Sequence, residues 1–108
     1  MASGDLTGAQ YRLVTFSGND VFLPTSGVLC AGYLQNKPAN NEHAAVISHG
    51  YSKVILAGSL GSGQELMAGN NGFATLAGSG QMVHGINHTS GNSGEIVDGM
   101  VVTYRKYV

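Results

Sequence analysis

Residues 29–54, LCAGYLQNKPANNEHAAVISHGYSKV, largely decide the fold that the sequence predicts. Over residues 29–34, Leu29, Ala31 and Tyr33 alternate with Cys30, Gly32 and Leu34, which is consistent with a short β-strand. A mainly polar stretch follows, and its proline favours a turn because proline lacks an N–H and fixes its own φ. Two further strands are expected at residues 43–48 and 51–57, with a tight turn between them. The stretch therefore predicts three strands joined by one long and one short turn.

The same pattern returns in weaker form later in the chain. Three pairs of positions coincide when the two stretches are aligned: Gly32 with Gly85, Glu42 with Glu95, and Ile47 with Met100. Each copy runs from a strand through a glycine and a polar turn to a glutamate and a second strand. Identity between the copies is low, so the repetition is a pattern and not proof of duplication. A repeat of strand pairs is what a small β-sandwich or β-barrel shows.

The rest of the chain also predicts short strands separated by turns. The additional strands are expected at residues 10–16, 21–23, 64–68, 73–76, 81–86 and 95–104. Glycine interrupts every recurrence of apolar residues that would mark a helix. We therefore expect an all-β fold, either a small single-domain β-sandwich or a partly open β-barrel, with roughly eight short strands.

One turn and one terminal segment stand out. Asn71 and Gly72 form a dipeptide that favours a type I′ hairpin turn, in which both central residues have positive φ. Residues 1–9 are small and polar, with Leu6 as the only sizeable internal apolar side chain. Such a segment buries too little to offset its ordering entropy, so we expect a flexible N-terminal arm. Residues 10–108 then form the single β domain.

Composition limits the classes of function. Charged residues make up 10% of the 108 residues, against about 25% in a typical domain. The net charge is −1 and the five basic residues are scattered, so no nucleic-acid surface is expected. No apolar run approaches the roughly 18 residues of a membrane span, and the N-terminus lacks the pattern of a signal peptide. Cys30 is the only cysteine, which fits folding in a reducing cytoplasm.

A family resemblance extends over residues 28–102. The residues that carry it are Leu34-Gln35-Asn36-Lys37-Pro38, Glu42, Ala44-Ala45-Val46, Gly50, Lys53-Val54, Gly61 to Leu66, Asn71-Gly72, Gly85 and Gly94-Glu95-Ile96. In these positions the chain resembles the small head-decoration, or capsid cement, proteins of tailed bacteriophages. It departs from that pattern at His49, Tyr51 and His84, where small or aliphatic residues are expected.

The resemblance implies a structural virion protein on the exterior of a phage head, made in the bacterial host cytoplasm. Its partners would be the major capsid protein, whose subunits it bridges and stabilises, and other copies of itself, most often in a trimer. An N-terminal arm would order on the capsid, and the candidate contact residues are Ser3, Gly4, Asp5, Leu6 and Thr7. Elimination from the residues themselves leads us to expect no enzyme activity, catalytic residue, cofactor or metal, and neither a nucleic acid nor a membrane as partner.

Two other functions remain open from the residues alone. A carbohydrate- or peptide-binding module would line a groove with aromatic side chains, and the candidates are Tyr11, Tyr33, Tyr51, Tyr104 and Tyr107. A small enzyme would use Cys30 as a nucleophile beside a histidine, although a lone cysteine among apolar residues is more often a buried hydrophobe. The four histidines are expected to be solvated or hydrogen-bonded rather than metal ligands, and Glu42 and Glu95 to keep strand ends soluble rather than to form an acid–base pair.

Overall fold

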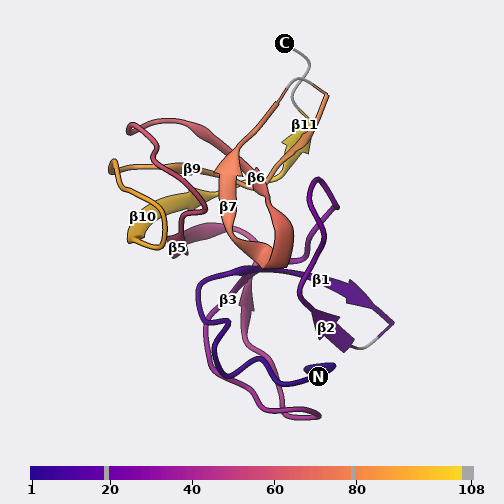
Figure 1. Ribbon diagram of the computed structural model, residues 1–108. Helices are drawn as coiled ribbons and strands as arrows, with labels where there is room; N and C mark the ends of the chain where they lie inside the picture. The colour runs from indigo at the N-terminus through magenta and orange to yellow at the C-terminus, as the bar shows by residue number, and fades with distance from the viewer. Residues whose placement is uncertain (19, 79, 106–108) are drawn as a thin grey trace.

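A four-stranded antiparallel sheet forms the N-terminal half of the molecule (Figure 1). The computed structural model describes residues 1–18, 20–78 and 80–105. In the order in which they pair, the four strands are β2 (Asp20–Phe22), β1 (Leu13–Ser17), β3 (Gly32–Leu34) and β4 (Val46–Ile47).

A five-stranded antiparallel sheet forms the other half. In pairing order its strands are β5 (Gly50–Ile55), β10 (Ile96–Val101), β9 (Gly85–Asn87), β6 (Glu65–Ala68) and β7 (Ala74–Leu76). The short 3₁₀ turn η1 (Asn70–Gly72) joins β6 to β7. A separate two-stranded sheet pairs β8 (Met82–Val83) with β11 (Tyr104–Arg105).

The prediction of an all-β fold is confirmed, and the sheets do not close into a barrel in the described part of the chain. Within the described residues the chain forms eleven short strands rather than about eight. Two of the expected strands, 81–86 and 95–104, are each divided into two. Residues 82–83 pair with β11, whereas residues 85–87 pair with β6 and β10. Alternation of side chains identifies extended backbone, but it does not identify the sheet that the backbone joins.

The two sheets repeat one another. The order β2-β1-β3-β4 corresponds to β7-β6-β9-β10, and every pairing in both sets is antiparallel. The registers correspond as well, since Tyr33 lies opposite Ile47 and Ile86 lies opposite Met100. The alignment that places Gly32 on Gly85 also places Tyr33 on Ile86 and Ile47 on Met100, so the two pairs occupy equivalent positions. The weak sequence pattern therefore marks a four-strand unit that occurs twice, with β5 added at one edge of the second unit.

Each unit also closes its polar turn with the same two hydrogen bonds. The N–H of Ala39 donates to Oε1 of Glu42 at 2.6 Å, and the N–H of Glu42 donates to the carbonyl oxygen of Ala39 at 3.0 Å. Asn92 and Glu95 form the same pair at 2.6 and 3.0 Å. Each glutamate thus satisfies a backbone donor in its own turn, which gives it a structural role.

The four-stranded sheet is covered on both faces. Leu13 and Tyr33 face the five-stranded sheet and belong to the larger core, together with Leu66 and Val97. The next residue along each of these two strands points to the opposite face, as strand geometry requires. The second core there contains Ala2, Leu6, Ala9, Val14 and Leu34.

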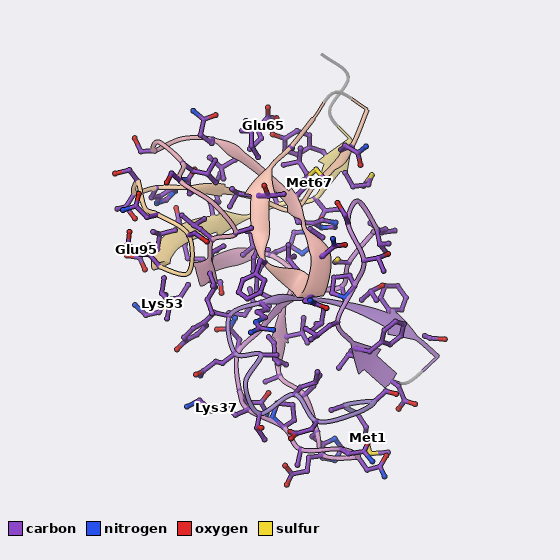
Figure 2. The ribbon with its side chains drawn as sticks, viewed as in Figure 1. Met1, Lys37, Lys53, Glu65, Met67 and Glu95 are labelled. Carbon is purple, nitrogen blue, oxygen red and sulfur yellow. The ribbon has the colours of Figure 1, made fainter. Side chains whose placement is uncertain are left out.

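The N-terminal segment supplies that second cover, so residues 1–9 are packed rather than extended as a free arm. Ala2, Leu6 and Ala9 are buried. The N–H of Leu6 donates to the carbonyl oxygen of Pro38 at 2.9 Å, and Figure 2 accordingly places Met1 and Lys37 at the same end of the molecule. The prediction of a flexible arm was based on the small apolar surface that the segment can bury against itself. In the structure the segment packs instead on the apolar face of the four-stranded sheet, which would otherwise be exposed.

The described residues contain no helix of the length and apolar character that crossing a membrane requires.

Candidate functional site

The β1–β2 hairpin exposes a phenylalanine on each of its two faces. Phe16 is 54% exposed and Phe22 is 37% exposed. Phe16 lies opposite Val21 and Phe22 lies opposite Thr15, so the two aromatic side chains point in opposite directions. Both faces of the hairpin therefore present a large apolar side chain, which makes the hairpin a candidate contact surface.

The outward side of the N-terminal segment adjoins this hairpin. The N–H of Ser3 donates to the carbonyl oxygen of Val21 in β2 at 2.8 Å. Of the candidate arm residues, Ser3, Gly4, Asp5 and Thr7 are exposed, whereas Leu6 is buried and cannot contact a partner unless the segment detaches.

This outward side is held by local hydrogen bonds. The N–H of Gly4 donates to Oδ1 of Asn40 at 2.9 Å, and the N–H of Thr7 donates to Oδ1 of Asp5 at 3.0 Å. Hydrogen bonds from the Thr7 backbone and side chain lower the pKa of the Asp5 carboxyl. A negative charge is therefore maintained on this surface.

The turn at Asn71 and Gly72 lies between the two sheets. Both residues have positive φ, 61° at Asn71 and 84° at Gly72. The hairpin closes with a bond from the N–H of Gly69 to the carbonyl oxygen of Phe73 at 2.7 Å, so three residues, not two, form its tip. The N–H of Asn71 donates to the carbonyl oxygen of Pro24 at 3.0 Å. The turn therefore links the two sheets and has a structural role, with Gly72 buried and Asn71 exposed.

The structure brings Cys30 beside His84. The N–H of Cys30 donates to Nε2 of His84 at 3.2 Å, while Sγ lies 3.4 Å from the carbonyl oxygen of Val28. Burial raises the pKa of the Cys30 thiol to about 12 and lowers the pKa of the His84 imidazole. The imidazole nitrogen that faces Cys30 accepts a backbone N–H, so it is not placed to take a proton from the thiol. This geometry does not activate a nucleophile.

The buried imidazole predicts that acid destabilises the fold. His84 has a pKa below its ordinary value of 6.5 in the folded state, so the unfolded chain binds the proton more readily. Its contribution is present above about pH 6.5 and is lost as the pH falls through the folded pKa. Urea unfolding between about pH 7.5 and 5 should show the free energy of unfolding decreasing with acidification.

His84→Gln is the matched comparison, because the glutamine amide oxygen can accept the same N–H without taking up a proton. The variant should lose less stability over this pH range than the natural chain does. An equal loss in both chains would assign the acid sensitivity to other groups.

The other three histidines do not form a site with one another. His43, His49 and His88 are exposed, and the described residues include no cluster of three His, Cys, Asp or Glu side chains suited to a metal ion.

The candidate tyrosines divide into three environments. Tyr11 and Tyr51 line one surface groove, whereas Tyr33 is fully buried. Tyr104 donates a short hydrogen bond to Glu65, which raises the pKa of its phenol to about 12. Tyr107 lies outside the described residues.

Comparison with known proteins relates the chain to others through its fold. No model of a known protein family matches it, and no curated protein matches its sequence. Among solved structures, the fold is similar to the N base of the head fiber protein gp8.5 in bacteriophage phi29, with a TM-score of 0.75 and 17% sequence identity. The match covers 94% of this chain and 88% of that one. The two chains therefore share a fold over nearly their whole lengths.

Proposed function

We propose that the chain is a structural protein of a phage virion, located on the exterior of the head and bound to the major capsid protein. The observation that carries the proposal is the shared fold with the base of a phage head fiber, since it extends over 94% of this chain. The sequence resemblance to head-decoration proteins supports the same location independently. Production in the cytoplasm of the bacterial host is consistent with the single, reduced cysteine.

The role that follows is to hold neighbouring capsid subunits together. A protein that binds the assembled shell and not its separated subunits stabilises the shell by mass action, by about 2.7 kcal/mol per site when its free concentration is 100 times Kd. Bound across a joint between subunits, it would oppose the separation that internal pressure drives. This role needs a rigid contact surface and no catalytic group.

The β1–β2 hairpin and the outward side of the N-terminal segment are the proposed contact surface. The hairpin offers Phe16 on one face and Phe22 on the other as anchors, and large aromatic side chains dominate the energy of many protein interfaces. Ser3, Gly4, Asp5 and Thr7 would provide the polar rim of the same surface. Leu6 stays inside and acts by holding the segment in place.

We extend the proposal to a small homo-oligomer, a trimer by resemblance. Exposed apolar side chains outside the hairpin, such as Leu76 at one sheet edge, are available for contacts between copies. Sedimentation analysis of the free protein and a reconstruction of the decorated head would measure this. A single chain in solution that also occupies the head without touching another copy would contradict it.

The capsid contact is tested with Phe16→Ser and Phe22→Ser. Assembled heads of the encoding phage are mixed with each purified variant, and bound protein is measured after sedimentation of the heads. Removing a buried aromatic anchor costs about 2 kcal/mol or more, so binding should weaken by a factor of about 30.

Ile96→Ser is the matched control, because Ile96 is 52% exposed but lies on the five-stranded sheet. It should bind heads as the natural chain does. If all three variants bound heads equally well, the hairpin would not be the capsid contact. If the natural chain did not bind heads, the proposed function would be rejected.

A further inference from the structure

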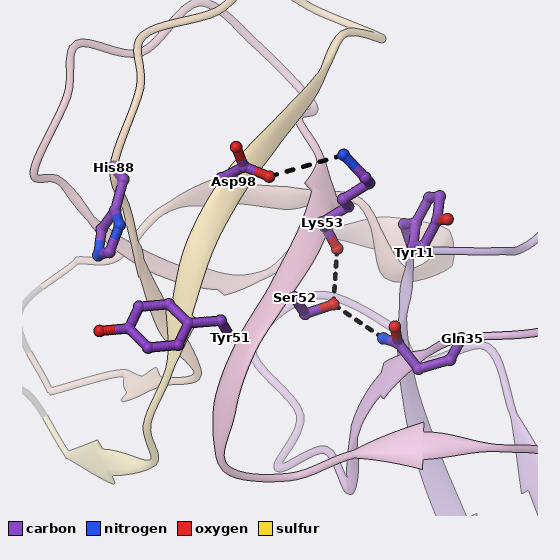
Figure 3. Close-up of a pocket in the computed structure, with 7 residues that line it drawn as sticks. All are labelled: Tyr11, Gln35, Tyr51, Ser52, Lys53, His88 and Asp98. Carbon is purple, nitrogen blue, oxygen red and sulfur yellow. Dashed lines mark hydrogen bonds and ion pairs between the residues drawn. The ribbon is translucent and has the colours of Figure 1, made fainter.

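A groove with a volume of about 510 Å³ opens between the two repeated units (Figure 3). Its volume is within the range of about 300–1,000 Å³ that is common for small-molecule sites. The side chains that line it come from both units: Tyr11, Gln35, Tyr51, Ser52, Lys53, His88 and Asp98. None of them is aliphatic, so the lining consists of polar groups and aromatic rings.

The side of the groove nearest the four-stranded sheet is a fixed polar network. Nε2 of Gln35 donates to Oγ of Ser52 at 2.8 Å and to the carbonyl oxygen of Tyr33 at 3.0 Å. Oγ of Ser52 in turn donates to the carbonyl oxygen of Lys53 at 2.9 Å. Both amide protons of Gln35 are therefore engaged, which orients its amide and leaves Oε1 as an acceptor for a ligand.

The charges of the groove balance. Nζ of Lys53 lies 3.7 Å from Oδ1 of Asp98, and both side chains are more than half exposed. An exposed ion pair at this separation contributes little to stability, and each partner keeps hydrogen-bonding capacity for a ligand. A site with one positive and one negative group has no net attraction for an ion. Its donors and acceptors instead suit a neutral ligand rich in hydroxyl groups.

Aromatic side chains stand at the two ends of this polar surface. Tyr51 is 68% exposed, and its ring meets that of His88 edge to face at a centroid distance of 5.4 Å. Tyr11 stands at the other end, beyond Ser52 and Lys53 (Figure 3). Its φ is 69°, a left-handed conformation that is costly for a bulky residue. Backbone strain of this kind concentrates at functional sites, where it positions a side chain.

We propose that this groove binds a neutral saccharide. The apolar C–H face of a sugar ring packs on a tyrosine ring, while its hydroxyl groups bond to paired donors and acceptors such as Lys53, Asp98 and the Gln35 amide. The open, elongated site fits a segment of a glycan chain better than a single enclosed sugar. A peptide strand fits less well, because alternate side chains of a peptide would require apolar pockets that the lining does not offer. The proposal stands independently of capsid binding.

The test uses an array of immobilised glycans that includes neutral hexose and N-acetylhexosamine polymers, with a parallel array of short peptides. The natural chain should bind at least one neutral glycan. Tyr51→Ala should weaken that binding by about tenfold, the loss expected for one aromatic contact. Tyr11→Asn should weaken it as well without lowering the melting temperature, because asparagine tolerates a left-handed backbone better than tyrosine does.

Phe16→Ala is the matched control, since it removes an exposed aromatic ring from outside the groove. It should leave glycan binding unchanged, while Tyr51→Ala should leave binding to phage heads unchanged. This crossed pair of results separates failure of the saccharide site from failure of the proposed function. Binding of no neutral glycan, binding of peptides alone, or glycan binding that survives both tyrosine substitutions would overturn the inference.

Discussion

Gly72→Ala should lower the free energy of unfolding by about 3 kcal/mol or more, although it adds only one methyl group. A Cβ at this position would lie 2.2 Å from the carbonyl oxygen of Leu13 and 3.2 Å from Cβ of Arg12. The φ of +84° is itself costly for any residue with a side chain. The turn cannot withdraw easily, because Asn71 bonds to Pro24 and the Arg12 guanidinium lies 4.2 Å from the Phe73 ring centroid.

Gly94→Ala isolates the contribution of the close contact. Gly94 has a φ of +81°, almost the same as that of Gly72, but no atom lies within 4 Å of the Cβ position. The control should therefore lose only the backbone preference, about 1 kcal/mol. Urea unfolding of both variants measures the difference. Equal losses would mean that the β6–β7 turn does not rest on β1 in solution.

The strand positions could be predicted because they depend on local signals. Turn residues and alternating side chains are visible in a window of a few residues. The repeat could be detected for a related reason, since Gly32 with Gly85 and Glu42 with Glu95 serve equivalent backbone requirements. The carboxylates close equivalent turns, and Gly32 leaves no room for a Cβ, which would lie 2.1 Å from the carbonyl oxygen of Ile47.

The groove could not be predicted because its parts are distant in sequence. Tyr11 precedes β1, Gln35 follows β3, and Asp98 lies in β10, so only the packing of the two units brings them together. Tyr51 was among five candidate tyrosines, and nothing local distinguished it from the buried Tyr33. One signal was available: Tyr51 departs from the small or aliphatic residue that the family resemblance leads one to expect, and a large exposed side chain at such a position suggests a specific use.

Leu6→Ala should destabilise the free protein by about 2–5 kcal/mol, the usual loss for a buried leucine. Leu6 is 3% exposed and packs in the core that contains Val14 and Leu34. Removing residues 1–8 should have at least as large an effect, because it would also uncover one face of the four-stranded sheet. These results would differ from the behaviour of a flexible arm, whose removal leaves the melting temperature nearly unchanged.

Ser3→Ala is the control within the same segment. Ser3 is exposed and is held through its backbone N–H, so this substitution should leave the melting temperature within about 2 °C of the natural value. Thermal unfolding of the free protein compares the two variants before any capsid is added. If Leu6→Ala melted like Ser3→Ala, the segment would be detached in solution and available as the arm that the sequence analysis expected. If only Leu6→Ala melted early, any accompanying loss of head binding would reflect loss of the folded surface rather than of an extended arm.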